Sequence, residues 1–222
     1  LKAPALSQFY GTDLDEIHLP MIVLPLHTDW QAKAMRECLT EFYAGLPQGA
    51  VPHFVFGNHD DKRLITRYGI EHHRSIAMLL LTLLGSPILY YGDEIAMCDT
   101  YISVERRVDT AGMIDPEHYT GRDPNRTPMQ WDASTHAGFT THSVEPWLPL
   151  NENRNTINVA TQEHDPASTL TFYKSLLQLR RESRALREGS IQFLEDYGDV
   201  LAYLRESDEE RLLIVINFSG DS

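Results

Sequence analysis

Val51-Pro52-His53-Phe54-Val55-Phe56-Gly57-Asn58-His59-Asp60 is the stretch from which the fold of this 222-residue chain can be inferred. The β-branched and aromatic residues from 53 to 56 favour a short buried strand, and the proline before them marks its start. Gly57 then lets the backbone turn. Asn58, His59 and Asp60 follow at the carboxyl end of the strand, the edge of a parallel α/β fold where catalytic loops converge. We predict a functional site at 58–60; the alternative is that Asp60 caps a helix over 62–68.

The composition is that of a globular chain, and its acidic charge suits a neutral ligand. Hydrophobic residues make up 42% of the sequence, which is enough for a core, and the formal net charge is −13. So acidic a chain argues against nucleic acid or an anionic membrane as a partner. Cys38 and Cys98 lie far apart in unlike contexts, so neither a disulfide framework nor a zinc site is indicated. We expect no cofactor.

Targeting and membrane signals are not apparent in the sequence. The most apolar stretch, 76–84, is about half as long as a bilayer requires, and the start of the chain does not read as a signal sequence. We therefore expect a cytoplasmic protein. The chain begins without Met and stops soon after a strong strand, which predicts that it is part of something longer.

Predicted strands and helices alternate along the first half of the chain. A helix over 29–44, with Asp29 as its N-cap, and a helix over 72–84 separate three predicted strands, at 18–24, 53–56 and 87–91. The helix over 72–84 is apolar on nearly every side, so it has to be covered on both sides. This alternation predicts the α/β class, with a parallel sheet and crossover helices.

The second half of the chain changes character twice. Residues 96–163 are rich in Pro, Gly, Asn and Asp and form a long loop, which Trp131, Phe139 and Trp147 predict to be ordered. After an amphipathic helix over 169–183, the hydrophobic period drops to two. This period predicts an antiparallel meander that opens a second domain, with strands at 191–194, 200–204 and 212–218.

The Gly57–Asp60 string is compatible with a metal site, because metallophosphoesterases carry a similar Gly-Asn-His-acid turn whose Asn and His bind metal. Their two-metal cage needs further Asp and His clusters upstream and downstream, and this sequence has none of them. His72 and His73 are adjacent and point to different sides of a helix, so we expect two surface histidines. No metal site is predicted.

Carboxylates at the next strand end offer another possibility. Asp93 and Glu94 could join Asp60, since glycoside hydrolysis requires paired carboxylates. The alternative is that they cap the following turn or pair with a basic residue. Gly121–Trp131 is more suggestive, because arginines held by prolines next to an indole can bind sugar hydroxyls and an apolar sugar face. Its alternative is an Arg-Asp pair that fixes a long loop.

Together these strings resemble the α-amylase superfamily, glycoside hydrolase family 13, in its α-glucosidase and oligo-1,6-glucosidase branch. In this order and spacing the matching strings are specific: Tyr10-Gly11, His18–Pro20, Leu46-Pro47 with Gly49-Ala50, Gly57–Asp60 with Arg63, Tyr90–Ile95, Gly121–Trp131, Ala137–Phe139, Pro146–Pro149, Asn158-Val159 and Gln162.

The resemblance implies the C-terminal part of a (β/α)8 TIM barrel, with 18–24, 53–56 and 88–91 as strands six to eight. Residues 1–186 would belong to that barrel, with the loop 96–163 after its last strand and 169–183 as its last helix. Residues 187–222 would be the truncated start of an antiparallel β domain.

The resemblance also implies a retaining, exo-acting α-glucosidase that hydrolyses short α-glucosides such as maltose, isomaltose or sucrose. Asp60 matches the carboxylate that holds the C2 and C3 hydroxyls and stabilises the transition state. His59 matches the histidine that binds the same sugar, and Arg122 matches the arginine that recognises the non-reducing end.

The family's nucleophilic Asp and acid/base Glu are expected before Leu1, so the 222 residues alone are expected to be inactive. A transglycosylating relative that forms trehalose or isomaltulose is one alternative. A non-catalytic, amylase-like ectodomain that serves as a transporter partner is another, against which the presence of His59, Asp60 and Arg122 together speaks.

Overall fold

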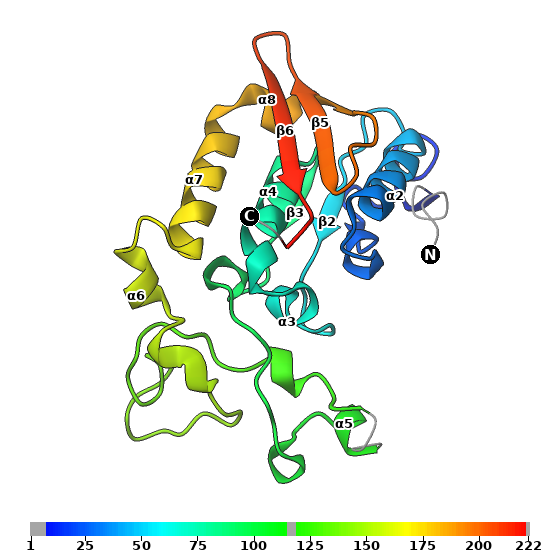
Figure 1. The fold of residues 1–222 in the computed structure, drawn as a ribbon. Coiled ribbons are helices and arrows are strands. Elements are labelled where there is room, and N and C mark those ends of the chain that lie inside the picture. Colours follow the sequence, from blue (N-terminus) through cyan, green and yellow to red (C-terminus); the bar gives the residue numbers. More distant parts are fainter. Residues whose placement is uncertain (1–7, 115–118, 221–222) are drawn as a thin grey trace. The chain divides into compact units, whose positions relative to one another are not determined.

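The structure is a computed structural model that describes residues 8–114 and 119–220 (Figure 1). It divides into two compact units that each combine segments distant in sequence. Unit 1 comprises Leu1–Phe56, Arg74–Ile88 and Ser175–Ser222, and unit 2 comprises Gly57–His73 and Leu89–Lys174. The predicted boundary at 186/187 stays a prediction.

Unit 1 contains the predicted parallel sheet. Strands β1 (Met21–Ile22), β2 (His53–Val55) and β3 (Ser86–Ile88) pair in the order β1-β2-β3, both pairs parallel. The ladder of β1 is much shorter than the predicted 18–24, because Pro20 and Pro25 on either side lack the amide hydrogens that a longer ladder needs. The predicted strand at 87–91 ends at Ile88.

Helix α2 (Ala32–Ala44) lies between β1 and β2 in sequence. It presents Ala32, Met35, Leu39 and Phe42 to the core at helical spacing. Phe42 and Tyr43 meet Phe54 of β2 edge-on, with ring centroids 5.6 and 5.9 Å apart. The predicted N-cap was wrong: the N-cap is Gln31, without a side-chain cap bond, because Asp29 belongs to a tight turn in which its carbonyl accepts the Gln31 amide.

Helix α4 (His73–Thr82) is the apolar helix predicted over 72–84, and it is covered as expected. Ile76, Ala77, Leu79, Leu80 and Leu81 are all buried. His72, predicted to lie on the surface, is buried instead, because it ends a 3-10 turn (Ile70–His72) directly before this apolar helix.

The antiparallel meander is confirmed as strands β4 (Ser190–Phe193), β5 (Val200–Glu206) and β6 (Arg211–Asn217), paired in that order (Figure 1). Two helices precede it, α7 (Thr169–Glu182) and α8 (Arg184–Glu188). Within unit 1 the meander packs against α2 and α4: the rings of Tyr43 and Phe193 are 6.0 Å apart, and Tyr203 OH lies 2.5 Å from Thr82 Oγ1.

Unit 2 is built largely from loops with short helices. Its α-helices include α3 (Leu64–Tyr68), α5 (Ala111–Ile114) and α6 (Val159–Glu163), and its 3-10 helices are 70–72, 93–95, 104–106, 123–125 and 152–155. The three aromatic residues expected to order the long loop are largely exposed. The loop is ordered instead around a small core that includes Ile95, Met97, Met129 and Leu170.

Gln162 ties that core together through its buried side-chain amide. Its Nε2 donates to the Ile95 carbonyl at 2.8 Å, and its Oε1 accepts from the Leu170 amide at 3.1 Å.

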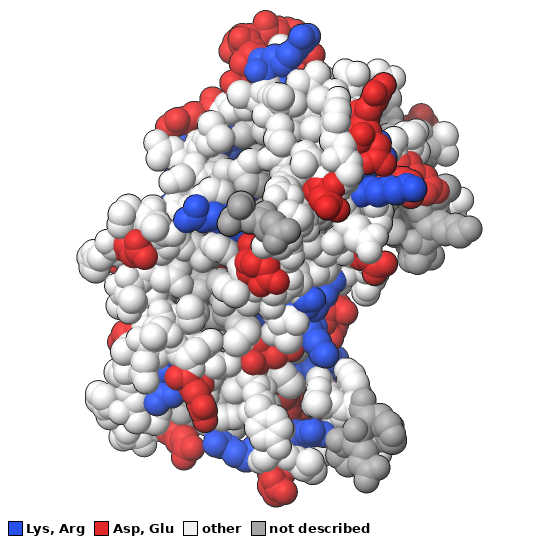
Figure 2. All heavy atoms as spheres, in the orientation of Figure 1, with Lys and Arg blue, Asp and Glu red and all other residues white. Residues whose placement is uncertain are grey.

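Lys, Arg, Asp and Glu side chains are intermixed over the face drawn in Figure 2. Among the described residues, none of the helices is both long and apolar enough to cross a membrane.

Candidate functional site

The site begins at Gly57, which follows β2 in sequence and belongs to unit 2. Its backbone is not left-handed, so the predicted need for a flexible turn was wrong. Glycine is required there for space: a Cβ on Gly57 would lie 2.5 Å from Asp93 Oδ2. The buried carboxylate therefore approaches the chain directly before the Asn-His-Asp sequence.

Asn58 shapes the loop that presents the candidate catalytic residue. Its Oδ1 accepts the amide hydrogens of Asp60 and Asp61 at 2.7 and 2.9 Å, which fixes a local turn. Asn125 Nδ2 donates to the Asn58 carbonyl from the long loop. Asp60 does not cap α3, because that helix begins at Leu64 with Arg63 in the N-cap position.

Asp60 is half-exposed, and three basic side chains surround its carboxylate. Arg122 Nη1 and Arg126 Nη2 both donate to Oδ1, at 3.1 and 3.0 Å, and His59 Nε2 lies 3.4 Å from Oδ2. Arg126 Nε also donates to the His59 carbonyl at 2.8 Å. The structure thus brings together the three residues predicted for the site, Asp60, His59 and Arg122, and adds Arg126.

This environment keeps the Asp60 carboxylate charged. The hydrogen bond from Arg122 is the main reason that its pKa lies below the ordinary value, and the charges of His59, Arg122 and Arg126 act in the same direction. Such a group can accept hydrogen bonds from hydroxyls and stabilise nearby positive charge. It is poorly suited to donate a proton.

Arg122 is itself held by a second carboxylate, that of Asp109. Asp109 is buried; its Oδ2 accepts from Arg122 Nε at 2.8 Å and its Oδ1 from Nη2 at 3.1 Å. Its pKa is strongly lowered, chiefly by this pair, and the pKa of Arg122 is raised. The alternative reading of this region, an Arg-Asp pair that fixes a long loop, is therefore realised alongside the contact with Asp60.

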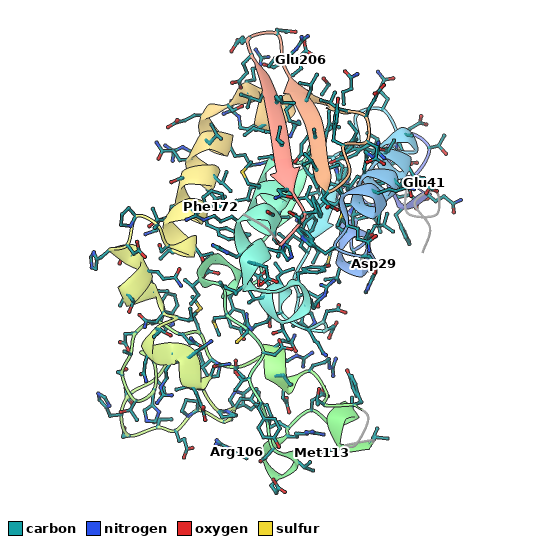
Figure 3. All side chains as sticks on the ribbon, viewed as in Figure 1. Asp29, Glu41, Arg106, Met113, Phe172 and Glu206 are labelled. Atoms are coloured by element: carbon teal, nitrogen blue, oxygen red, sulfur yellow. The ribbon has the colours of Figure 1, made fainter. Side chains whose placement is uncertain are left out.

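A close crossing of two loop segments brings these residues together. At Gly112 a Cβ would lie 2.7 Å from the Thr120 carbonyl oxygen and 2.8 Å from the Gly121 nitrogen, so the backbones touch where only glycine fits. Asp123 Oδ2 accepts the amide hydrogens of Val108 and Asp109, at 2.6 and 2.9 Å. Arg106 and Met113, labelled in Figure 3, lie on either side of Asp109 in sequence.

Asp93 and Glu94 are not part of this cluster. Asp93 is buried, and burial raises its pKa to about 7. Glu94 Oε2 accepts the Gly92 amide at 2.7 Å and so caps the turn, one of the structural roles considered for it. The buried guanidinium of Arg63 lies over the rings of Tyr90 and Tyr91.

Two residues of the site were missed by the sequence analysis. Arg126 lies four positions after Arg122 in a string already singled out, and the turn around Pro124 that places both on Asp60 was the available signal. Nothing in the sequence around Asp109 indicates that it pairs with Arg122, because this pairing depends on the crossing of two irregular loop segments. The indole of Trp131 lines a pocket of about 460 Å³ together with Arg126 rather than Arg122.

Asp60 also borders a second cavity of unit 2, with a volume of about 320 Å³. Its walls include Asp61, Tyr119, Thr120 and Gly121. This volume is at the small end of the range of ligand pockets, about 300 to 1,000 Å³. Among the described residues, no three His, Cys, Asp or Glu side chains are grouped so that they could hold a metal ion.

The chain is similar in sequence to a known protein family and to several known proteins. Residues 22–189 match the family model described as alpha amylase, catalytic domain. The chain is 36% identical over 197 residues to an alpha-glucosidase from Apis mellifera, covering 87% of this chain and 34% of that protein. It is 35% identical over 189 residues to an amino acid transporter heavy chain from Rattus norvegicus, covering 84% of this chain and 26% of that protein.

Among solved structures, the chain is similar to an alpha-glucosyl transfer enzyme, XgtA, with a TM-score of 0.90 and 31% sequence identity. The match covers 98% of this chain and 41% of that one. The chain thus spans about a third or less of the two curated relatives named above, and under half of this structural neighbour.

Proposed function

Because the chain belongs to the α-amylase catalytic-domain family, glycoside hydrolase family 13, we propose that the complete protein is a retaining, exo-acting α-glucosidase. Its substrates are short α-glucosides of the maltose, isomaltose or sucrose type. The single observation that carries this proposal is the position of Asp60, whose carboxylate is held between Arg122 and Arg126 with a lowered pKa.

Asp60 stabilises the transition state rather than attacking the sugar or protonating the leaving group. Hydrolysis of a glycosidic bond passes through a state in which positive charge develops on the sugar ring. A carboxylate that stays ionised and accepts the C2 and C3 hydroxyl hydrogens favours this state over the ground state. His59, 3.4 Å from Asp60, binds the same sugar, and Arg122 recognises its non-reducing end.

In this proposal the two carboxylates that perform the covalent chemistry, a nucleophilic Asp and an acid/base Glu, are not among the 222 residues. In this proposal β1, β2 and β3 are strands six to eight of the barrel, and residues 187–222 begin the C-terminal β domain. The 222 residues alone have no glucosidase activity.

Two other functions have specific support. The similarity to an alpha-glucosyl transfer enzyme supports a transglycosylating relative, which uses the same carboxylates and excludes water from the intermediate. The similarity to an amino acid transporter heavy chain supports a non-catalytic ectodomain. The second alternative explains the arrangement around Asp60 less well, because a protein without catalysis has no need of a half-exposed carboxylate held by two arginines.

Asp60→Asn in the complete protein tests the proposal. The amide keeps the size of the side chain and loses its charge, so kcat/KM for 4-nitrophenyl α-glucoside should fall by about 100-fold or more. Asp132→Asn is the matched control, because Asp132 accepts the amide hydrogen of Ser134 in its own turn and should change kcat/KM less than about twofold.

The outcomes separate the candidates. Turnover close to wild type in Asp60→Asn, with an unchanged melting temperature, contradicts the role of Asp60. A wild-type protein without turnover favours the ectodomain. Glucosyl transfer to a second sugar in preference to water favours the transglycosylating relative.

A further inference from the structure

The guanidinium of Arg122 is shared between two carboxylates in unequal ways. Asp109 accepts from two of its nitrogens, Nε and Nη2, at 2.8 and 3.1 Å, whereas Asp60 accepts only from Nη1 at 3.1 Å. Asp109 also accepts the Arg122 backbone amide at 2.8 Å. Both the main chain and the plane of the guanidinium are therefore set by one buried residue.

We propose that Asp109 is a positioning residue, which acts on the substrate site by holding Arg122 so that a single N–H reaches Asp60. This inference rests on the proposed function of Asp60. An arginine fork pairs most favourably with both oxygens of one carboxylate. With its fork occupied by Asp109, Arg122 leaves the other oxygen of Asp60 to His59 and to the hydroxyls of the sugar.

The surroundings of Asp109 suit this role. The side chain is buried, while Arg122 and Asp60 are accessible to a ligand. The Asp109 backbone is fixed in turn by Asp123, whose carboxylate accepts its amide hydrogen at 2.9 Å. The hydrogen bonds that connect Asp109 to Asp60 run through the guanidinium of Arg122, so we expect its effect on the substrate to pass through Arg122.

A double-mutant cycle in the complete protein tests the inference. The variants are Asp109→Asn, Arg122→Ala and the two combined, with kcat and KM for 4-nitrophenyl α-glucoside and the melting temperature as readouts. Asp109→Asn should lower kcat/KM by about 10- to 100-fold, with the larger share in KM, because Arg122 is assigned to binding. Asp132→Asn should stay within about twofold.

The decisive number is the effect of Asp109→Asn once Arg122 is alanine. If Asp109 acts through Arg122, the second change should alter kcat/KM by less than about twofold, because the interaction has already been lost. A loss of the same size in both backgrounds would mean that Asp109 only maintains the loop, and would overturn the inference. A change below twofold in Asp109→Asn alone would also overturn it.

Two other outcomes are possible, a variant that does not fold and a wild-type protein without turnover. If Asp109→Asn does not fold, Asp109→Glu replaces it in the same cycle, since it keeps the charge and displaces the carboxylate by one methylene; additive effects then overturn the inference. If the wild-type protein has no turnover, the proposed function fails and the inference fails with it. An active wild type with an additive cycle contradicts only the role of Asp109.

Discussion

Asp60 and Asp93 show at the scale of single residues how two carboxylates of one unit acquire opposite properties. Asp60 is half-exposed between cations, and its pKa is lowered. Asp93 is buried, and its pKa is raised to about 7 by desolvation, which the charge of Arg63 offsets only in part. Only Asp60 is suited to remain ionised over the whole neutral pH range.

The raised pKa of Asp93 predicts a pH dependence of stability. Unfolded, this carboxyl has a pKa near 3.9, so between about pH 4 and 7 the folded protein holds a proton that the unfolded chain has lost. The free energy of unfolding should therefore fall as the pH rises through this window and level off above it. Asp93→Asn should remove this slope, on the order of a few kcal/mol.

Urea unfolding of the wild type and Asp93→Asn at several pH values from 4.5 to 8 measures this effect. Asp208→Asn, in the exposed turn between β5 and β6, is the control and should keep the wild-type slope. An identical pH dependence in the wild type and Asp93→Asn would show that Asp93 is not protonated in the folded protein.

At this scale the sequence predicted part of the site. His59 and Asp60 could be recognised because a strand-like run leads into them, and Arg122 because it stands in a distinctive string with Pro124 and Trp131. The function of Gly57 was misread, since space for the Asp93 side chain depends on a contact 36 positions away. Asp109 was missed because nothing in the local sequence specifies which loop it crosses.

At the scale of elements, two arginines hold the end of α4: Arg205, which is buried, and Arg180, which is half-buried. Arg180 Nη1 donates to the carbonyls of Leu81 and Leu83, and Arg205 Nη1 donates to that of Thr82 at 2.6 Å. Arg205 is fully buried, its pKa is lowered to about 10 by burial, and its remaining nitrogens donate to the carbonyls of Ser190, Ala185, Leu186 and Gly189. It thereby joins α4, α8 and β4.

Arg205→Met should destabilise the protein strongly. The apolar side chain has a similar length, but it removes the hydrogen bonds that five carbonyl oxygens accept from Arg205. Since a buried unsatisfied group costs about 1 to 3 kcal/mol, we expect the free energy of unfolding to fall by about 3 kcal/mol or more. Urea unfolding measures the change.

Arg211→Met is the matched control, because Arg211 is largely exposed and pairs with Glu206 at the surface. It should leave the free energy of unfolding close to that of the wild type, because an exposed ion pair contributes little. Equal losses in the two variants would mean that the carbonyl bonds of Arg205 contribute nothing specific. The hydrophobic pattern predicted α2, α4, α7 and the meander, because each buries apolar residues at the spacing of its element. It could not predict Arg205, whose charge argues for a surface position.

At the scale of the whole molecule, the meander shares its core with the parallel sheet and its helices. Unit 1 contains β1 to β3 together with β4 to β6. Trp30 stacks on Phe218 with ring centroids 4.3 Å apart, and Tyr43 and Tyr203 both lie near Phe193. The alternation of hydrophobic residues and the order of the predicted elements predicted both sheets. The shared core could not be predicted in this way, because it depends on contacts between residues far apart in the sequence.

This shared core predicts that the protein does not tolerate loss of the meander. A complete protein shortened to end after Glu188 should lose cooperative thermal unfolding and bind a hydrophobic dye, because α2 and α4 would expose the apolar surface now covered by β4 to β6. Leu213→Ser in the complete protein is the control, because this β6 side chain is exposed; it keeps the meander and the stacked rings, and it should unfold cooperatively. If the version ending after Glu188 also unfolds cooperatively without binding the dye, residues 187–222 form a separable domain and the shared core is not needed for folding.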